Sequence, residues 1–403
     1  MFNLFPRSKW LRQEQDFAAR MSALGPTRIF VTGATGFVGG AVAAALVGTP
    51  HFKQMLFLVR AKSAAEGAQR VRQSIARFSS SEVPPHVSES QIVVGDLNDP
   101  RAFLDARLDQ VSHVIHGAAI TSLANRQDIW AVNVDATLRL AERFSGVSSL
   151  RRFVYVGAAM ACGVARGPLV TEALRLPVER AHLAPYTASK ACAENQLREC
   201  FPDLPLVAVR PSMVIGHSWL GCKPSARNFW VLKVISELNR FVCPPSAYLD
   251  IVPVDYCARI IVELTLKKSL SFSAYHVSAG QQSSTMVAEL LQAFQGLGGK
   301  GKVQAYMRVA EADLMNMALS LGERHAAQQK AGEAPHYEPF NTRLLCKALR
   351  LYGRFSRLNY VFDQQRVLGE GLQPAPSFLD YINLCDHSIR NLSLKSQMAC
   401  DFE

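Results

Sequence analysis

Short apolar runs and helix-type periodicities alternate along the first half of the chain. The runs are typical of strands buried on both faces, and they lie at residues 29–31, 54–60, 91–97, 111–119, 152–159 and 206–214. Helices are predicted between them at 63–78, 129–144 and 185–200. Because strands that alternate with helices join through right-handed crossovers, we expect an α/β fold with a doubly wound, mainly parallel sheet.

Three glycines follow the first strand. Gly33 permits a sharp turn, Gly36 lets a backbone approach a phosphate, and Gly39 lets the next helix pack on the sheet. In a strand, turn and helix context, the helix N-terminus points its N–H groups at a dinucleotide pyrophosphate. This predicts a Rossmann-type cofactor site that includes Thr32, Gly33, Thr35, Gly36, Phe37, Val38 and Gly39.

The end of the second strand indicates which dinucleotide binds. An acidic side chain here selects the free ribose 2′-hydroxyl, whereas an arginine accommodates a 2′-phosphate. The chain has Arg60 and then Lys62, with no acid before Glu66. We therefore predict NADP rather than NAD; the alternative is that Arg60 caps the strand and faces water.

Other strand ends supply further cofactor candidates. The ligand crevice of a doubly wound sheet lies beyond the carboxyl ends of its strands, so we assign to it Asp96, Leu97, Gly117, Ala118, Ala119 and Asn133. The carboxylate of Asp96 is placed to accept from the adenine amino group, and the small residues 117–119 let a cofactor lie against backbone. His116 is expected to be structural rather than catalytic.

Tyr186 and Lys190 are the catalytic candidates. They are four residues apart in the predicted helix 185–200, so they share one face. A nearby ammonium favours the phenolate and is expected to lower the pKa of Tyr186 toward the working range. Lys190 could also hold the nicotinamide ribose.

These motifs occur in the order of a known family. TGATGFVG, GDL, HGAA, Asn133 and YTASK resemble the extended short-chain dehydrogenase/reductases. LFLVRAKSAAEGAQRVRQSI and RPSMVIGHSWLG resemble the branch with fatty acyl-CoA reductases and thioester reductase domains. The resemblance implies NADPH-dependent reduction of an acyl-CoA or acyl-carrier-protein thioester to an aldehyde or alcohol. It also implies that Pro211, Ser212 and Met213 lie along the nicotinamide.

The chain departs from this family at one position. The family places a serine or threonine at the end of the fifth strand to bond the reacting carbonyl oxygen, and here Ala158 takes that position. Loss of one such donor costs about 100- to 1,000-fold in rate. Thr121 or Ser122 could supply a substitute hydroxyl. Two alternatives therefore stay open: a catalytically impaired NADP-binding sensor or partner protein, and an alcohol dehydrogenase or epimerase acting on a sterol- or sugar-type substrate.

Three regions are expected. Residues 1–25 form a basic N-terminal extension, 26–286 the NADP-binding domain with substrate-binding segments at about 215–275, and 287–403 a mostly helical C-terminal region. The first 25 residues lack the apolar centre of a signal peptide, and no run is long enough to span a membrane.

Composition narrows the class of protein. The chain has 403 residues, 49% of them hydrophobic and 19% charged, which is typical of a globular protein. Nine cysteines without a Cys-x-x-Cys pair argue against a disulfide framework and a zinc site, so we expect a reducing cytoplasm and no metal. The net charge of +11 favours anionic partners. Because this charge is spread along the chain without interleaved aromatics, nucleic acid is not expected.

One C-terminal segment has both a basic and an apolar stripe. In residues 343–358, Arg343, Lys347, Arg350, Arg354 and Arg357 recur at helical spacing beside Leu344, Ala348, Leu351, Phe355 and Leu358. Such a helix could lie peripherally on a membrane surface or receive an acidic carrier protein. The simpler interpretation buries the apolar stripe against the reductase and leaves the cations in water.

Overall fold

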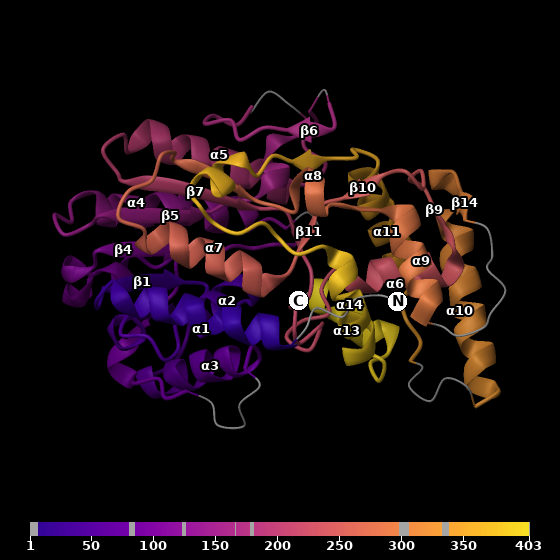
Figure 1. Cartoon of the computed structure of the whole chain (residues 1–403), viewed down its shortest axis with the longest axis horizontal. Coiled ribbons are helices and arrows are strands. Elements are labelled where there is room, and N and C mark those ends of the chain that lie inside the picture. The colour runs from indigo at the N-terminus through magenta and orange to yellow at the C-terminus, as the bar shows by residue number, and fades with distance from the viewer. Residues whose placement is uncertain are drawn as a thin grey trace.

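A computed structural model of the chain describes residues 7–79, 85–122, 126–165, 167–177, 181–297, 306–332 and 338–402. Its main element is a parallel sheet with the strand order β12-β7-β5-β4-β1-β2-β3 (Figure 1). The strands are β1 (Ile29–Thr32), β2 (Leu56–Val59), β3 (Ile92–Val94), β4 (His113–His116), β5 (Arg152–Val156), β7 (Leu206–Pro211) and β12 (Ala274–Val277). The predicted doubly wound α/β fold is confirmed.

The order of the strands fixes where a ligand can bind. β1 lies between β2 and β4, with Val31 opposite Phe57 on one side and Ile115 on the other. The chain therefore adds strands first on one side of β1 and then on the other. The carboxyl end of β1 is thus the topological switch point, where a crevice opens in folds of this kind.

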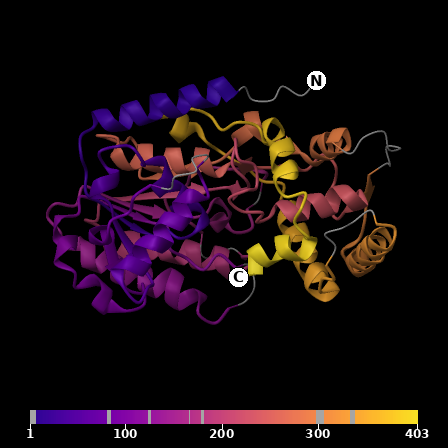
Figure 2. The ribbon, with the colours of Figure 1, turned by 90° about the horizontal axis from the view of Figure 1, so that it is seen from below.

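Helices cover both faces of the sheet, as the view in Figure 2 shows. One face packs against α2 (Phe37–Ala45), α3 (Ala64–Ala76) and α7 (Val254–Leu266). The opposite face packs against α4 (Ala136–Ser145) and α5 (Pro185–Cys200). Because side chains alternate along a strand, Val31 joins the first core and Phe30 the second. Double coverage explains why the strands read as continuous apolar runs.

Residues 7–23 form an additional helix, α1 (Arg7–Ala23), outside this layer. Its Phe17 and Met21 are buried in the core that includes α7. Charged contacts add to the packing, because Arg20 pairs with Glu263 and Glu14 lies 3.6 Å from Arg259. The basic N-terminal stretch is thus fixed to the sheet domain through acidic as well as apolar contacts.

The C-terminal region builds a second core beside the sheet. Buried side chains come from α6 (Phe229–Leu238), α9 (Val287–Leu297), α10 (Leu314–Lys330), α11 (Thr342–Ser356) and α13 (Ile382–Ser388). Smaller helices are α8 (Gly280–Ser283), α12 (Gln365–Gly369) and α14 (Leu394–Phe402). Two-residue strand pairs join the regions: β6 (Leu169–Val170) with β15 (Val361–Phe362), β8 (Met213–Val214) with β11 (Ile251–Val252), β9 (Arg240–Phe241) with β14 (Met307–Arg308), and β10 (Tyr248–Leu249) with β13 (Thr285–Met286). The predicted helical C-terminal extension is confirmed.

The helix α11 buries a different set of apolar residues from the predicted stripe. Leu345, Ala348 and Leu349 are buried in the second core, and of the predicted stripe only Ala348 is among them, while Leu344 is partly buried there. On the basic side, Arg350, Arg354 and Arg357 all pair with Glu311, at 3.5, 2.8 and 2.8 Å. The buried side of α11 is therefore packed on the second core, which supports the simpler interpretation of this segment. Within the described ranges, no helix is both long and apolar enough to cross a bilayer.

Candidate active site

The turn between β1 and α2 has the backbone shape that its glycines predict. Gly33 has a φ of 80°, and a Cβ there would lie 2.7 Å from the Ala118 nitrogen. A Cβ on Gly39 would lie 2.2 Å from the Gly33 carbonyl oxygen, so α2 can approach the turn only without a side chain at residue 39. Gly36 caps α2 without a side-chain hydrogen bond, which leaves the first N–H groups of the helix for an anion. The turn therefore fits a dinucleotide pyrophosphate.

The adenosine end of the expected site lies at β2 and β3. The side chain of Arg60 is 76% exposed, and its Nε is 3.9 Å from Asp96 Oδ2. Asp96 also accepts a hydrogen bond of 2.8 Å from the backbone nitrogen of Asn98. Lys62 is exposed, and its backbone nitrogen donates to Glu66. Both cations are thus available at the strand edge for a 2′-phosphate.

Several apolar candidates for the cofactor site direct their side chains toward protein. Phe37 and Val38 pack partly buried on the core beneath the glycine turn. Leu97 is buried in the core on the opposite face of the sheet. At these positions a cofactor can therefore contact the backbone groups rather than the side chains.

The loop after β4 is joined to the glycine turn through Thr32. Its carbonyl accepts from Gly117 at 3.2 Å, and its hydroxyl accepts from the Ala118 nitrogen at 3.2 Å. The same hydroxyl bonds His116 Nδ1 at 2.7 Å, while His116 Nε2 bonds the hydroxyl of Thr137 at 2.8 Å. Burial lowers the pKa of His116 to about 3. His116 is therefore neutral and structural in the geometry described.

Asn133 connects this loop to the catalytic helix. It lies in a single π-helical turn, Ala131–Asp135, a distortion that often occurs at functional sites. Its amide group bonds both the nitrogen and the carbonyl of Ile120, at 2.8 and 3.0 Å. It also donates to the hydroxyl of Ser189 at 3.0 Å, and that hydroxyl donates to the Tyr186 carbonyl at 2.9 Å. Asn133 thus fixes the start of α5 against the loop after β4.

Tyr186 and Lys190 both lie in α5, but they do not form the predicted electrostatic pair. The partly buried position of Tyr186 raises the pKa of its phenol to about 12. The Lys190 ammonium lies instead over the ring of Tyr155, 4.4 Å from its centre. The prediction that Lys190 lowers the pKa of Tyr186 is therefore not met in this structure, where burial of the phenol is the cause of the shift.

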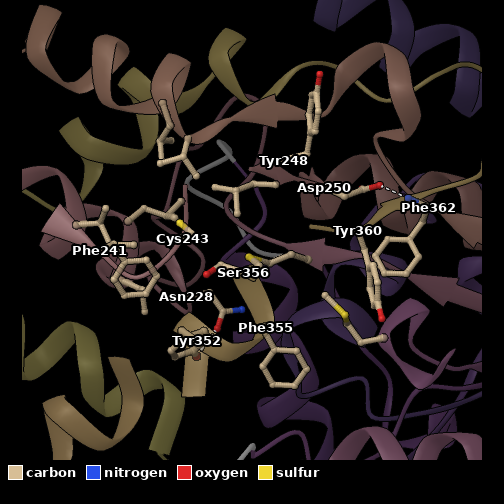
Figure 3. A pocket seen from close by; sticks show the side chains of 18 residues that line it. Asn228, Phe241, Cys243, Tyr248, Asp250, Tyr352, Phe355, Ser356, Tyr360 and Phe362 are labelled. Carbon is tan, nitrogen blue, oxygen red and sulfur yellow. Dashed lines mark hydrogen bonds between the residues drawn. The ribbon is translucent and has the colours of Figure 1, made fainter. Parts of the chain in front are cut away.

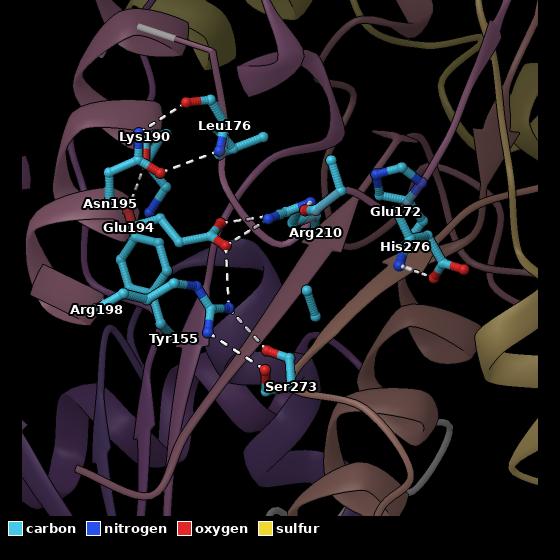
Figure 4. Close-up of polar contacts among 12 residues, drawn as sticks. Tyr155, Glu172, Leu176, Lys190, Glu194, Asn195, Arg198, Arg210, Ser273 and His276 are labelled. Carbon is cyan, nitrogen blue, oxygen red and sulfur yellow. Dashed lines mark hydrogen bonds and ion pairs between the residues drawn. The ribbon is translucent and has the colours of Figure 1, made fainter. Parts of the chain in front are cut away.

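Below Lys190, the interior side of α5 carries a buried charge network (Figure 4). Glu194 accepts from Arg210 Nε at 2.9 Å and from a second nitrogen of the same guanidinium, with both side chains fully buried. Arg198 donates to the same carboxylate at 3.3 Å. Burial lowers the pKa of Lys190 to about 7, and the nearby Glu194 opposes this shift. The network thus holds α5 against β7 and keeps one carboxylate beneath the lysine.

The position expected to carry a hydroxyl donor has none. Ala158 follows β5 in extended conformation and is buried. Among the substitute candidates, the Thr121 hydroxyl accepts a hydrogen bond of 3.2 Å from Arg227 Nη1.

The segment expected to lie along the nicotinamide follows the end of β7. Pro211 is the last residue of β7, and the Ser212 nitrogen donates to the Val277 carbonyl, which places this segment beside β12.

An apolar cavity begins beside these strand ends and extends into the second core (Figure 3). Met160 and Met213, from the segments that follow β5 and β7, line it together with residues of α6, α9 and α11. The space inside it that a water-sized sphere can occupy is about 60 Å³. Polar groups in the wall are engaged: the Tyr352 hydroxyl donates to Asn228 at 2.7 Å, and Asp250 accepts from Phe362 at 3.0 Å. The cavity therefore suits an apolar chain.

Comparison with known proteins assigns the family. Residues 31–261 match the model of the NAD-binding family described as male sterility protein. The chain belongs to this family. It is an extended short-chain dehydrogenase/reductase of the branch that contains fatty acyl-CoA reductases and thioester reductase domains, as the sequence predicts.

The curated proteins that resemble this chain share little sequence identity with it and are longer than it is. A Drosophila melanogaster protein named as a fatty acyl-CoA reductase is 26% identical over 269 residues, 57% of this chain and 50% of that protein. The aldehyde reductase lnaA of Aspergillus flavus is 26% identical over 282 residues, 62% of this chain and 25% of that protein. The chain thus spans half or less of the length of these relatives.

Solved structures resemble this chain over nearly its whole length, including the C-terminal region. The terminal R domain from the myxalamid PKS-NRPS pathway has a TM-score of 0.68 at 21% identity, covering 94% of this chain and 97% of that one. A thiolation-reductase di-domain from an archaeal non-ribosomal peptide synthetase has a TM-score of 0.66 at 16% identity, covering 96% and 81%. At these identities the comparison establishes a shared fold.

Sequence reasoning missed two parts of this site. Tyr155 was assigned only to a strand, although strand alternation puts it on the face that α5 covers. The cavity walls come from α6, α9 and α11, which are distant in sequence, and no local pattern links them. Within the described ranges, no three His, Cys, Asp or Glu side chains gather to hold a metal ion.

Proposed function

We propose that this protein is an NADPH-dependent reductase of an acyl thioester or a related carbonyl. One observation carries the proposal. Tyr186 and Lys190 begin the helix after β5, and an apolar cavity starts at Met160, two residues beyond Ala158. A carbonyl held near Tyr186 could therefore extend its acyl chain into the second core.

Different residues around the crevice would bind different parts of the cofactor. The glycine turn would receive the pyrophosphate, Arg60 and Lys62 the 2′-phosphate, and Lys190 the nicotinamide ribose. When bound, NADPH supplies the hydride. The absence of an acidic residue between Arg60 and Glu66 supports NADP over NAD.

Tyr186 is the proposed proton donor. With a pKa raised to about 12 by burial, its phenol carries the proton at neutral pH but is a weak general acid, so efficient transfer requires this pKa to fall when the substrate and cofactor are bound. A second donor is missing at Ala158, and Thr121 is the substitute we propose, because its hydroxyl can accept from Arg227 and still donate.

The substrate class follows from the cavity and from the names of the relatives. Its lining is almost entirely aliphatic, aromatic or sulfur-containing, so hydrophobic burial of an acyl chain is the available source of binding energy. Relatives named as a fatty acyl-CoA reductase and an aldehyde reductase support acyl-CoA or acyl-carrier-protein substrates and an aldehyde or alcohol product.

Consumption of NADPH with a series of acyl-CoA thioesters tests the proposal. We expect oxidation of NADPH that depends on acyl-CoA, and its loss in Tyr186→Phe, with aldehyde or alcohol identified by mass spectrometry. Cofactor binding, measured by calorimetry, is the control for folding. Binding of NADPH without turnover of any acyl-CoA or acyl-carrier substrate would contradict the reductase proposal.

Ala158 favours a second candidate, an NADP-binding sensor or partner protein with impaired catalysis. Without a hydroxyl at this position, the rate should fall by about 100- to 1,000-fold relative to a complete site. Retention of Tyr186 and Lys190 argues for the enzyme, because binding alone does not require the phenol.

A further inference from the structure

A short segment of the C-terminal region returns to the sheet domain after α11. This return segment, residues 359–364, contains β15, which pairs in parallel with β6. The Val361 nitrogen donates to the Pro168 carbonyl at 2.8 Å, and on the other side the Phe362 nitrogen donates to Asp250 Oδ2 at 3.0 Å. The return segment is therefore fixed by contacts on both sides, although it lies beyond the family match, which ends at residue 261.

Tyr360 of the return segment packs against the stretch that follows Ala158. Its side chain is buried in a small core that also contains Ala159. Its hydroxyl accepts from the Ala165 nitrogen and donates to the Gly163 carbonyl at 3.3 Å. Tyr360 therefore contacts this stretch through both its ring and its hydroxyl, and two backbone groups fix the position of the hydroxyl.

The same ring lines the apolar cavity. Tyr360 and Phe362 are two residues apart in an extended segment, so their side chains share a face, with ring centres 6.0 Å apart. Both residues line the cavity together with Met160. In Figure 3, Tyr360 and Phe362 lie at one side of the pocket, and Phe241 and Cys243 lie at the other. Tyr360 thus forms the wall at the end of the cavity that adjoins the stretch after residue 158.

We propose that the Tyr360 ring determines which substituents are accepted next to the reacting carbonyl. This inference rests on the proposed function, which places the carbonyl of an acyl thioester near Tyr186 and its chain in the cavity. The first carbons of the chain would then lie beside the Tyr360 ring. A branch at these carbons would have to displace a ring that is buried and held by two backbone groups, and a packed core resists such displacement. The substrate class is therefore an acyl thioester without a branch at the carbon next to the carbonyl.

Binding of acyl-CoA isomers to the full chain tests the role of the Tyr360 ring. The ligands are a straight-chain acyl-CoA and its 2-methyl isomer with the same number of carbons, and calorimetry in the presence of NADP measures their dissociation constants. The unmodified chain should bind the straight isomer about tenfold more tightly or better, because one misplaced methyl group in an apolar pocket has an effect of this size. In Tyr360→Leu this preference should disappear. In Tyr360→Phe, which keeps the ring, it should persist.

Tyr352→Leu is the matched control, since Tyr352 also lines the cavity. It lies in α11, and its hydroxyl donates to Asn228, at the start of α6, at 2.7 Å. Its replacement should weaken the binding of both isomers alike and leave the preference unchanged. Met160→Ala is the second variant, because Met160 packs against the same small core as Tyr360. It should relax the preference as Tyr360→Leu does, and it decides the question if Tyr360→Leu melts below the temperature of the titration.

The outcomes separate this inference from the proposed function. If Tyr360→Leu and Met160→Ala keep the preference for the straight isomer, or if the unmodified chain has no such preference, the inference is wrong. Binding of neither isomer would also overturn it, whereas the reductase proposal is decided separately by the consumption of NADPH. If the expected preference is found but no NADPH is consumed, the reductase proposal fails and the ring still selects the acyl group that binds.

Discussion

The Lys190 ammonium lies 4.4 Å from the centre of the Tyr155 ring. The Tyr155 hydroxyl also donates to the Lys190 carbonyl at 3.3 Å, so one tyrosine on β5 contacts both the backbone and the side chain of the lysine. A cation over an aromatic face is stabilised by the ring's electron density. Tyr155 is therefore a positioning residue for Lys190, although it has no expected contact with the cofactor.

Substitution of Tyr155 should affect NADPH binding through Lys190. Tyr155→Leu removes the ring, and we expect NADPH affinity to fall by roughly fivefold, the equivalent of about 1 kcal/mol of cation–π energy. Tyr155→Phe keeps the ring and loses only the hydroxyl, so its affinity should stay near that of the unmodified chain. Fluorescence titration measures both. Equal losses in the two variants would show that the ring does not position the lysine.

Lys190 should make stability depend on pH. Its pKa is lowered to about 7 in the folded chain, so between pH 7 and 10 the unfolded chain binds a proton that the native chain lacks. Stability should therefore rise with pH in this window, and below pH 7 the contribution is constant. Urea unfolding at several pH values from 6 to 9 tests this. The rise of the unfolding free energy with pH should become smaller in Lys190→Met and should persist in Lys53→Met, an exposed control. A pH dependence that is unchanged in Lys190→Met would refute the assignment.

A hydroxyl at residue 158 should increase the rate. In Ala158→Thr we expect kcat for acyl-CoA reduction to rise by about 100-fold or more, because a donor would face the reacting oxygen. Ala158→Val is the matched control, since valine has the shape of threonine without the hydroxyl. A comparable rise in both variants would attribute the effect to packing. No rise in either would shift weight to Thr121, for which Thr121→Val is the test.

Arg60 should determine the choice of cofactor. Arg60→Gln removes the guanidinium beside the expected 2′-phosphate, and NADPH affinity should fall by about tenfold or more, with little change for NADH. Lys62→Gln measures the contribution of the neighbouring cation separately. Parallel losses for NADPH and NADH would mean that Arg60 supports the fold of the strand end instead.

Filling the cavity should change the acyl chain that is accepted. Leu290 in α9 lines the cavity and is buried. In Leu290→Trp we expect turnover of long acyl-CoA thioesters to fall by at least about tenfold while short ones are retained, because the added volume displaces the end of the chain. Leu290→Ala should have the opposite preference. A uniform loss for all chain lengths in Leu290→Trp would indicate general disruption.

The sheet could be predicted because its strands are buried on both faces and read as apolar runs. Ile29 to Val31 and Leu206 to Val209 are such runs, and the glycine spacing after the first strand fixed the direction of the crevice. The seventh strand, β12, was not predicted, although it is as long as β1, β2 and β4. The predicted strand 206–214 also ran too far, since the chain leaves the sheet at Ser212 and pairs again in β8.

The site was harder to predict than the fold. Helical spacing correctly put Tyr186 and Lys190 in one helix, but a four-residue spacing cannot tell which side chain a lysine meets across space. Its neighbour is Tyr155, on a strand more than thirty residues earlier. Such relationships depend on tertiary packing.

Part of the cavity wall comes from a stretch of the chain other than the one that carries Tyr186 and Lys190. The family match ends at residue 261, whereas Val287, Leu290, Tyr352 and Phe355 line the cavity beyond it. If the proposed function holds, substitutions in these C-terminal helices would change the acyl chain that fits while leaving Tyr186 and Lys190 in place. Substrate range could then be engineered from residues that lie outside the nucleotide-binding part of the chain.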